Sequence, residues 1–182
     1  LVGSEMCIRD SFLPDPRQDP VAYLSACFSL PGWLVSEWAA EFGAEWVRDI
    51  CMGCNRRPSV YVRVNALKTD ANGLVKRFDG AGVRAEVVAA PRGDMLRLMG
   101  PQAITQLPGF ADGLFAVQDL SASGAVRLLD PQGGWRILDL CAAPGTKTTQ
   151  LAERTRGEAR IVATDLNAER LAQVRGNVAR LG

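Results

Sequence analysis

The sequence predicts an α/β protein, in which a small α+β module precedes a segment where strands and helices alternate. Two observations carry this prediction. Residues 59–99 contain an alternating strand, a helix and two further strands, an order typical of an α+β module. Residues 115–181 then alternate between strand and helix with short loops, and that order predicts parallel strands joined by right-handed crossovers.

Two short helices are expected before the module. Apolar residues recur at helical spacing over residues 33–42 and 44–54, and Gly43 separates the two segments. Aromatic residues at this spacing usually pack in a core, and three tryptophans are therefore expected to be core residues: Trp33, Trp38 and Trp46.

The N-terminal stretch is set apart from the fold. Leu1–Ser11 shows neither helical nor strand periodicity and resembles translated sequencing-adapter sequence, so that Cys7 receives no functional interpretation. A natural disordered N-terminus is the alternative. Residues 12–20 contain three prolines and are expected to form an extended linker. The resulting division is a linker segment, an α+β module and an alternating segment: residues 1–20, 21–110 and 111–182.

The module is built around one clearly alternating strand. Over residues 59–65, valines occupy one face, while Tyr61, Arg63 and Asn65 occupy the other. The remaining elements are a helix at residues 70–80 and two strands at residues 84–88 and 95–99. A turn at residues 91–94 joins the two strands.

The alternating segment begins with a short strand at residues 115–118. Asp119 or Ser121 can cap the following helix, whose apolar residues recur at i, i+3, i+4 and i+7 up to Leu129. The further elements are a strand at residues 136–140, a helix that follows a small-residue loop and contains Leu151 and Ala152, a strand at residues 161–164 and a last helix at residues 168–181.

The loop between the first two of these elements is the most informative part of the chain. The segment DLCAAPGTKT, Asp139–Thr148, follows an apolar strand and opens a helix, which is the layout of a nucleotide-type cofactor site. Its small residues let backbone N–H groups approach a ligand. The dehydrogenase pattern G-x-G-x-x-G is absent, because the loop has one glycine. The ATPase pattern also fails, because Thr146 separates Gly145 from Lys147.

Asp165 ends the next strand, 20 residues after Gly145. An acidic residue at this place can accept hydrogen bonds from ribose hydroxyls. The alternative is that Asp165 only caps the last helix together with Asn167. The cofactor loop upstream favours the ribose interpretation.

Several strings together resemble the RsmB/Sun family of RNA cytosine-5 methyltransferases. They are FAVQDLSA at residues 115–122, LDLCAAPGTKTTQ at residues 138–150, PGWLV at residues 31–35 and RVNALK at residues 63–68. The resemblance covers roughly residues 21–182, and the strings occur in the family's order. It implies a Rossmann-like S-adenosylmethionine domain, of which this chain carries the first half, preceded by an RNA-binding module.

The resemblance also implies the roles of individual residues. Asp165 binds the ribose of S-adenosyl-L-methionine, and the loop wraps its methionine and ribose portions through Cys141, Ala142, Ala143, Pro144, Gly145, Thr146 and Lys147. Family members attack C6 of a flipped-out cytosine with a cysteine thiolate, which activates C5 for methylation. Those cysteines lie downstream in the family, so no catalytic residue is expected here, and the chain is expected to be inactive alone.

RNA, and ribosomal RNA in particular, is the expected partner. Arg63 and Asn65, beside Tyr61 on one strand face, form a candidate contact surface for single-stranded RNA. An ordinary solvent-facing strand surface is an equal alternative. Lys147 is expected near the methionine carboxylate or an RNA phosphate, the alternative being a solvated lysine.

Composition excludes several other classes. No apolar run approaches the roughly 20 residues that span a bilayer, so no membrane association is expected. The five cysteines are odd in number and unevenly spaced, which favours a reducing cytoplasm over a disulfide framework. Cys51 and Cys54 have C-x-x-C spacing, but the chain has no second pair and no histidine, and no metal site is expected.

Two departures from the family pattern and two alternatives remain. Leu30 stands where many members have histidine, and Thr146 where many have glycine. A non-catalytic RNA- or cofactor-binding module, or a methyltransferase with another acceptor, would also fit the loop. A half-built parallel sheet would expose apolar surface, so the isolated chain is expected to aggregate and to bind S-adenosylmethionine weakly.

Overall fold

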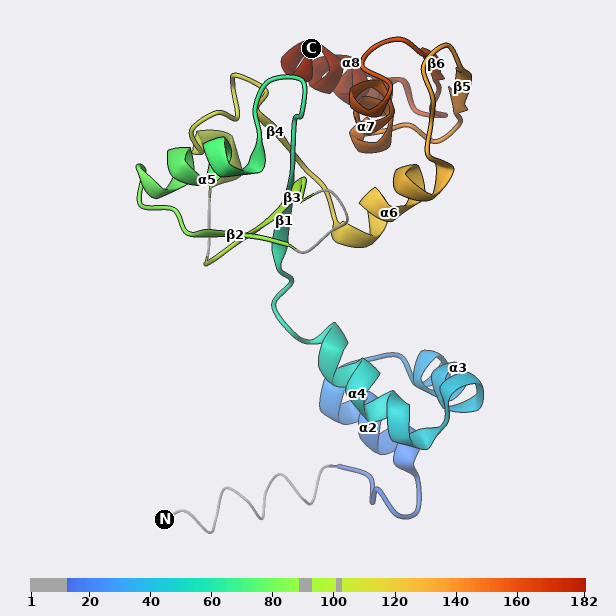
Figure 1. The fold of residues 1–182 in the computed structure, drawn as a ribbon. Helices are drawn as coiled ribbons and strands as arrows, with labels where there is room; N and C mark the ends of the chain where they lie inside the picture. Colours follow the sequence, from blue (N-terminus) through green and yellow to red (C-terminus); the bar gives the residue numbers. More distant parts are fainter. Residues whose placement is uncertain (1–12, 89–92, 101–102) are drawn as a thin grey trace. The chain divides into compact units, whose positions relative to one another are not determined.

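The structure is a computed structural model that describes residues 13–88, 93–100 and 103–182, and its chain divides into two units at Pro58 and Ser59. The segment Leu1–Ser11, with Cys7, lies outside the described residues, as does part of the turn expected at residues 91–94. The first unit consists of helices, whereas the second contains both sheets (Figure 1).

The described residues of the first unit, from residue 13 onward, form three helices: α2 Pro20–Phe28, α3 Gly32–Phe42 and α4 Ala44–Cys54. Its core is formed by Val35, Val47 and Cys51, all of which are almost fully buried. Helices α3 and α4 agree with the sequence expectation. Helix α2 was missed because the prolines before it suggested only a linker. A proline at the first helical position and the Asp19 carboxylate, which accepts from the N–H of Ala22 at 2.8 Å, start this helix.

The expectation for the tryptophans is wrong in two of three cases. Trp33 is 70% exposed and Trp46 is 65% exposed, whereas Trp38 packs against the core. A helical turn of 3.6 residues places Val35 and Val47 inward, so Trp33 and Trp46 fall on other faces of their helices. Spacing alone did not identify the buried face.

The second unit begins with a four-stranded antiparallel sheet in the order β2-β3-β1-β4, with helix α5 on one face. The central strand β1 pairs with β3 through Val62 and Leu96 and with β4 through Val62 and Val117. The elements in chain order are β1 Val60–Val64, α5 Ala71–Asp79, β2 Ala85–Val87, β3 Met95–Leu98, the 3-10 turn η1 Ile104–Gln106 and β4 Phe115–Val117.

One face of this sheet holds the main apolar core of the unit. Val62 and Val64 of β1 pack with Leu74 and Phe78 of α5 and with Phe115 of β4. The rings of Phe78 and Phe115 meet edge to face, with their centroids 5.4 Å apart. The alternation of valines in β1 therefore predicted the core face correctly.

Strand β4 corrects the expected organisation of the chain. The strand expected at residues 115–118 was assigned to the alternating segment, with a boundary near residues 108–114. The structure instead pairs β4 antiparallel with β1 in the first sheet. A three-residue strand carries no signal of its partner, because its neighbour is set by long-range packing.

The C-terminal part of the second unit forms a strand-helix-strand-helix unit. Strands β5 and β6 pair in parallel, with Leu138 opposite Val162. This pairing confirms the crossover predicted from the alternation. The elements are α6 Leu120–Leu129, β5 Arg136–Asp139, α7 Thr146–Arg154, β6 Arg160–Ala163 and α8 Ala168–Leu181.

The two-stranded sheet is covered on one face and open on the other. Ile137 and Ile161 are half-buried on the side of α7, whereas Leu138 is 59% exposed and Val162 is 49% exposed on the opposite side. Exposed apolar side chains next to unpaired strand edges favour association between molecules. None of the helices among the described residues combines the length and apolar character that a bilayer crossing requires.

Replacing Leu138 and Val162 together by threonine should reduce self-association of the chain. Threonine has a β-branched shape suited to a strand and removes exposed apolar surface. Light scattering at increasing protein concentration would measure the effect. The single variant Ile161→Thr, which changes the covered face, should lower stability without improving solubility. Equal aggregation of the double variant and the unchanged chain would contradict the prediction.

Candidate cofactor site

The loop between β5 and α7 lies where two parallel strands end. Its backbone is fixed at both ends, because the N–H of Ala142 donates to the carbonyl of Thr164 at 2.9 Å and the N–H of Gly145 donates to the carbonyl of Ala142 at 2.6 Å. Loops at the carboxyl ends of parallel strands are the usual ligand sites of open α/β sheets. The sequence therefore placed this loop in the expected structural setting.

Gly145 is required for a reason that sequence reasoning missed. Its φ of +99° lies in the left-handed region, and a Cβ there would lie 3.2 Å from the Cα of Val174 in α8. Gly145 is buried, so its missing side chain lets the last helix approach the loop rather than a ligand. A glycine that serves helix packing has the same sequence appearance as one that serves a cofactor.

Asp165 is bound into the same loop. One carboxylate oxygen accepts from the N–H of Ala143 and the other from the N–H of Asn167, both at 3.1 Å. The hydrogen bond from Asn167 is the main cause that lowers the pKa of the Asp165 carboxyl, and the bond from Ala143 adds to it. Each oxygen keeps a further acceptor site for a hydroxyl group.

Asn167, rather than Asp165, caps helix α8. Helix α8 is capped by Asn167, whose side-chain oxygen accepts from the N–H groups of Glu169 and Arg170 at 2.8 and 3.1 Å. Asp165 therefore stands before the helix rather than at its cap. Its carboxylate is turned to the loop.

The other loop residues differ in how accessible they are. Cys141, Pro144 and Lys147 are exposed, whereas Ala142 is buried and Ala143 and Thr146 are half-buried. The N–H of Thr149 bonds back to the carbonyl of Gly145 at 2.9 Å. The amides before it belong to the first turn of α7, where N–H groups have no intrahelical acceptor and can donate to an anionic or polar group.

The hydrogen bond between Asp139 and Thr148 also holds the start of helix α7. The hydroxyl of Thr148 donates to a carboxylate oxygen of Asp139 at 2.7 Å. Asp139 is the last residue of β5, so this bond ties the strand to the helix across the loop. The sequence contained both residues in the motif but gave no sign that they bond to each other.

The residues of this loop fit the polar groups of S-adenosylmethionine. The Asp165 carboxylate, held ionised, offers free acceptor sites to the neighbouring hydroxyls of a ribose. The first turn of α7 offers N–H donors to a carboxylate. Acceptors for ribose hydroxyls and donors for a carboxylate are therefore both present at the carboxyl ends of the two parallel strands.

Arg63 does not form the exposed RNA-contact surface considered from the sequence. The side chain is 1% exposed and reaches from β1 to helix α7. Its Nε and Nη2 donate to the two carboxylate oxygens of Glu153 at 2.8 and 2.6 Å, which forms a bidentate ion pair. Burial raises the pKa of the Glu153 carboxyl, while the hydrogen bonds and charge of Arg63 act in the opposite direction.

Asn65 is likewise buried, at 1% exposure, and is not a surface residue. Its amide donates to the carbonyls of Gly113 and Leu181 at 2.9 and 2.8 Å, and its oxygen accepts from the N–H of Leu67. The alternation in β1 identified the face that carries Arg63 and Asn65. It did not show that α7 and α8 cover this face.

Lys68 and Arg180 complete the contact between the sheet and α8. The ammonium of Lys68 donates to the carbonyls of Asp112 and Arg180 at 3.0 and 3.1 Å. The guanidinium of Arg180 lies 4.1 Å from the centre of the Phe110 ring and donates to the carbonyl of Phe115 at 3.0 Å. The carbonyls that end a helix need such donors.

The described cysteines of the helical unit differ in their burial. Cys51 is buried, and burial, together with the neighbouring Cys54, raises the pKa of its thiol. Cys27 and Cys54 are exposed. Among the described residues, no group of three or more histidine, cysteine, aspartate or glutamate side chains is arranged to hold a metal ion.

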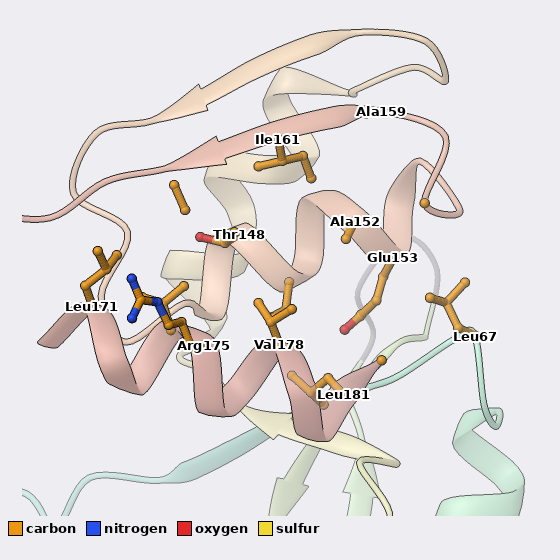
Figure 2. Close-up of a pocket in the computed structure, with 15 residues that line it drawn as sticks. Leu67, Thr148, Ala152, Glu153, Ala159, Ile161, Leu171, Arg175, Val178 and Leu181 are labelled. Carbon is orange, nitrogen blue, oxygen red and sulfur yellow. The ribbon is translucent and has the colours of Figure 1, made fainter. Parts of the chain in front are cut away.

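A cavity of about 470 Å³ lies on another side of α7 (Figure 2). Leu171, Val178 and Leu181 of α8 point into it, opposite Ile161 of β6 and Ala152 of α7. Its lining comes mainly from α7, β6 and α8, together with Leu67, rather than from the loop Cys141–Lys147. The cavity is therefore mostly apolar, with Glu153 and Arg175 among its lining residues, and is separate from the cofactor loop.

Two family models match this chain. Residues 126–182 match the 16S rRNA methyltransferase RsmB/F model, and residues 30–105 match the ferredoxin-like domain of RsmF/B-like methyltransferases. The described fold agrees with both, as a ferredoxin-like sheet followed by part of a Rossmann-like methyltransferase fold.

Curated relatives give the same family. The chain is 44% identical over 151 residues to ribosomal RNA small subunit methyltransferase B of Serratia proteamaculans and 42% identical over 152 residues to that of Erwinia tasmaniensis. Each match covers 83% of this chain and 34% of the relative. The chain therefore spans about a third of the length of the curated relatives that it matches.

Solved structures share the fold. The structure of PH0851 has a TM-score of 0.83 at 28% identity and covers 94% of this chain and 38% of its own. A methyltransferase homolog from Pyrococcus horikoshii has a TM-score of 0.77 at 28% identity, covering 90% of this chain and 53% of its own. Together with the family models, these likenesses show that the chain belongs to the RsmB/Sun methyltransferase family.

Asn65→Ala should lower the free energy of unfolding by about 1–3 kcal/mol, because it leaves buried carbonyl groups without their donor. Urea denaturation followed by circular dichroism would measure the loss. Gln132→Ala is the matched control, since this exposed amide bonds only to the carbonyl of Asp130 in its own turn and should change stability little. A loss no larger than that of the control would show that Asn65 is not a structural residue.

The carboxyl of Asp165 should titrate below the ordinary aspartate range. Because its folded-state pKa is lowered, its contribution to stability is present above the unfolded pKa and is lost as the pH falls through the lower folded value. Carbon-13 spectra of the side-chain carboxyl groups between pH 2 and 6 would follow the titration. Asp165→Asn identifies the signal by its disappearance, and a midpoint at or above about 3.9 would disprove the prediction.

Proposed function

We propose that this chain is the cofactor-binding part of an S-adenosylmethionine-dependent RNA methyltransferase that modifies C5 of cytosine in ribosomal RNA. One observation carries the proposal. The CAAPGTK loop stands at the ends of two parallel strands and holds Asp165 through its own backbone, in a chain 44% identical to a ribosomal RNA small subunit methyltransferase B.

Different residues of the site bind different groups of the cofactor. The Asp165 carboxylate accepts from the ribose hydroxyls, because its two bonds to backbone amides fix its position and keep it ionised. The first turn of α7 and the exposed Lys147 receive the methionine carboxylate. When bound, S-adenosylmethionine supplies the electrophilic methyl group.

The RNA contacts are assigned to Lys147 rather than to the strand residues. Arg63 and Asn65 are buried in bonds to α7 and α8, so they have no free donors for a phosphate. Lys147 is exposed on the first turn of α7, beside the cofactor loop. A ribosomal RNA substrate would place the protein in the cytoplasm.

The acceptor chemistry belongs to the whole protein. Cytosine C5 becomes nucleophilic when a thiolate adds to C6, and the proton on C5 then leaves to a base. Cys141 is exposed but belongs to the cofactor loop, and we assign it to lining the cofactor rather than to attack on the base. The 182-residue chain alone is therefore expected to bind the cofactor weakly and to methylate nothing.

Asp165→Ala should weaken S-adenosylmethionine binding by about tenfold or more, since two hydrogen bonds to a charged acceptor are lost. Isothermal titration calorimetry of the 182-residue chain would measure the dissociation constant. Asp49→Ala, an exposed carboxylate on α4, is the control and should leave it unchanged. Equal affinity of the Asp165 variant and the unchanged chain would remove Asp165 from the site.

The reaction itself is tested with the full-length protein that contains this chain. Unmodified small-subunit ribosomal RNA, incubated with methyl-labelled S-adenosylmethionine and digested to nucleosides, should yield labelled 5-methylcytidine. Label in another nucleoside would disprove the proposed acceptor. Tight cofactor binding without any transfer would instead favour a non-catalytic binding module.

A further inference from the structure

Arg63 stands out because it is a fully buried cation outside the cofactor loop, and one of its hydrogen bonds nevertheless reaches that loop at the carbonyl of Thr146. All five of its N–H donors are used: two on Glu153, one on Gln118, one on the carbonyl of Thr146 and one on the hydroxyl of Thr149. A guanidinium presents its donors in a rigid planar fork. The four residues that accept these bonds are therefore held in one fixed arrangement.

Two of these bonds define the junction of the loop and helix α7. Nη1 donates to the carbonyl of Thr146 at 2.8 Å, and Nη2 donates to Oγ1 of Thr149 at 3.0 Å. The Thr149 hydroxyl in turn lies 2.9 Å from the carbonyl of Gly145, to which it donates. Arg63 thus bonds directly to Thr146, where the loop meets the helix. It also reaches Gly145 through the hydroxyl of Thr149.

The anchor at the other end is rigid. Arg63 lies in the central strand β1, between β3 and β4, opposite Met95 and Ala116. Gln118, which follows β4, accepts from Arg63 and donates to Oε1 of Gln150 in α7 at 2.7 Å. The ferredoxin-like sheet therefore fixes α7 at two neighbouring points.

The positive charge of Arg63 is neutralised before it can act on a ligand at the loop. The carboxylate of Glu153, 7% exposed, pairs with it in two hydrogen bonds. The pair is formed between the sheet and the covered face of α7. The contribution of Arg63 to the site is consequently one of position rather than of charge.

We propose that Arg63 is a positioning residue of the cofactor site, which holds Gly145 and Thr146 in the conformation that binds S-adenosylmethionine. The proposal rests on the proposed function in one respect, the identity of the ligand. Without Arg63, the bond between Asp139 and Thr148 and the bonds from Thr149 to the Gly145 carbonyl would remain, but the Thr146 carbonyl and the Thr149 hydroxyl would lose the guanidinium that fixes both of them to β1. The loop would then sample other conformations and bind the cofactor less tightly.

The variant must separate position from stability. Arg63→Met alone leaves the buried carboxylate of Glu153 without a partner and destabilises the fold. The double variant Arg63→Met with Glu153→Met removes both charges, so that the unpaired charge is gone while the bonds to Thr146 and Thr149 stay lost. Leu74→Ala is the control, because this fully buried residue belongs to the apolar core on the opposite face of the sheet.

Two measurements on the 182-residue chain decide the proposal. Hydrogen–deuterium exchange without ligand should show faster exchange at Ala142, Gly145 and Thr149 in the double variant than in the control. Calorimetry with S-adenosylmethionine should show a dissociation constant raised about tenfold, as expected when a charge-assisted hydrogen bond that holds a binding conformation is lost. The control should keep the dissociation constant and the loop exchange of the unchanged chain, whatever its melting temperature.

The outcomes are distinct. Loop exchange and affinity equal to those of the control would overturn the positioning role and leave the proposed function intact. Failure of the unchanged chain to bind S-adenosylmethionine would count against the proposed function, and the exchange rates of the loop amides would still decide whether Arg63 positions the loop.

Discussion

The buried ion pair between Arg63 and Glu153 is the interaction on which the second unit depends. It joins the central strand of one sheet to the helix that follows the cofactor loop, across a face that would otherwise meet water. A buried ion pair contributes little net stability when its desolvation is counted, but breaking it is costly. Its value lies in the single geometry that five donors and their acceptors permit.

Around this pair, one short segment of sequence holds helices α7 and α8 of the C-terminal part. Arg63 binds α7, whereas Asn65 and Lys68 bind carbonyls at the end of α8. The RVNALK string thus connects the four-stranded sheet to helices α7 and α8, which belong to the part with the second sheet. Its polar residues are structural in the described unit, although their types are equally suited to RNA.

The sequence predicted the elements well and their partners less well. Helices α3, α4 and α8 and the parallel pairing of β5 and β6 followed from periodicity and capping, which are local signals. The burial of Arg63 and the pairing of β4 with β1 depend on contacts across 50 or more positions of sequence. Alternation in a strand tells which residues share a face but not what covers it.

The candidate site shows the same division. The loop, its place at a strand end and the acidic residue after the next strand were all predictable, because each is a local pattern with a chemical reason. The packing role of Gly145 against Val174 and the bond from Ala143 to Asp165 depend on the folded chain. The sequence could name these residues without giving their mutual contacts.

The place of β4 has a consequence for how this family can exchange parts. Strand β4 pairs with β1, while Gln118 just after it bonds to Gln150 of α7. The ferredoxin-like sheet and the Rossmann-like part are therefore joined through shared contacts, the seam between them, rather than by a flexible connection. A recombination event between residues 108 and 114, where composition suggests a border, would separate Arg63 from Glu153 and β4 from β1. The two parts are therefore expected to be inherited as one block, and a chimera would have to carry both sides of the seam from the same parent.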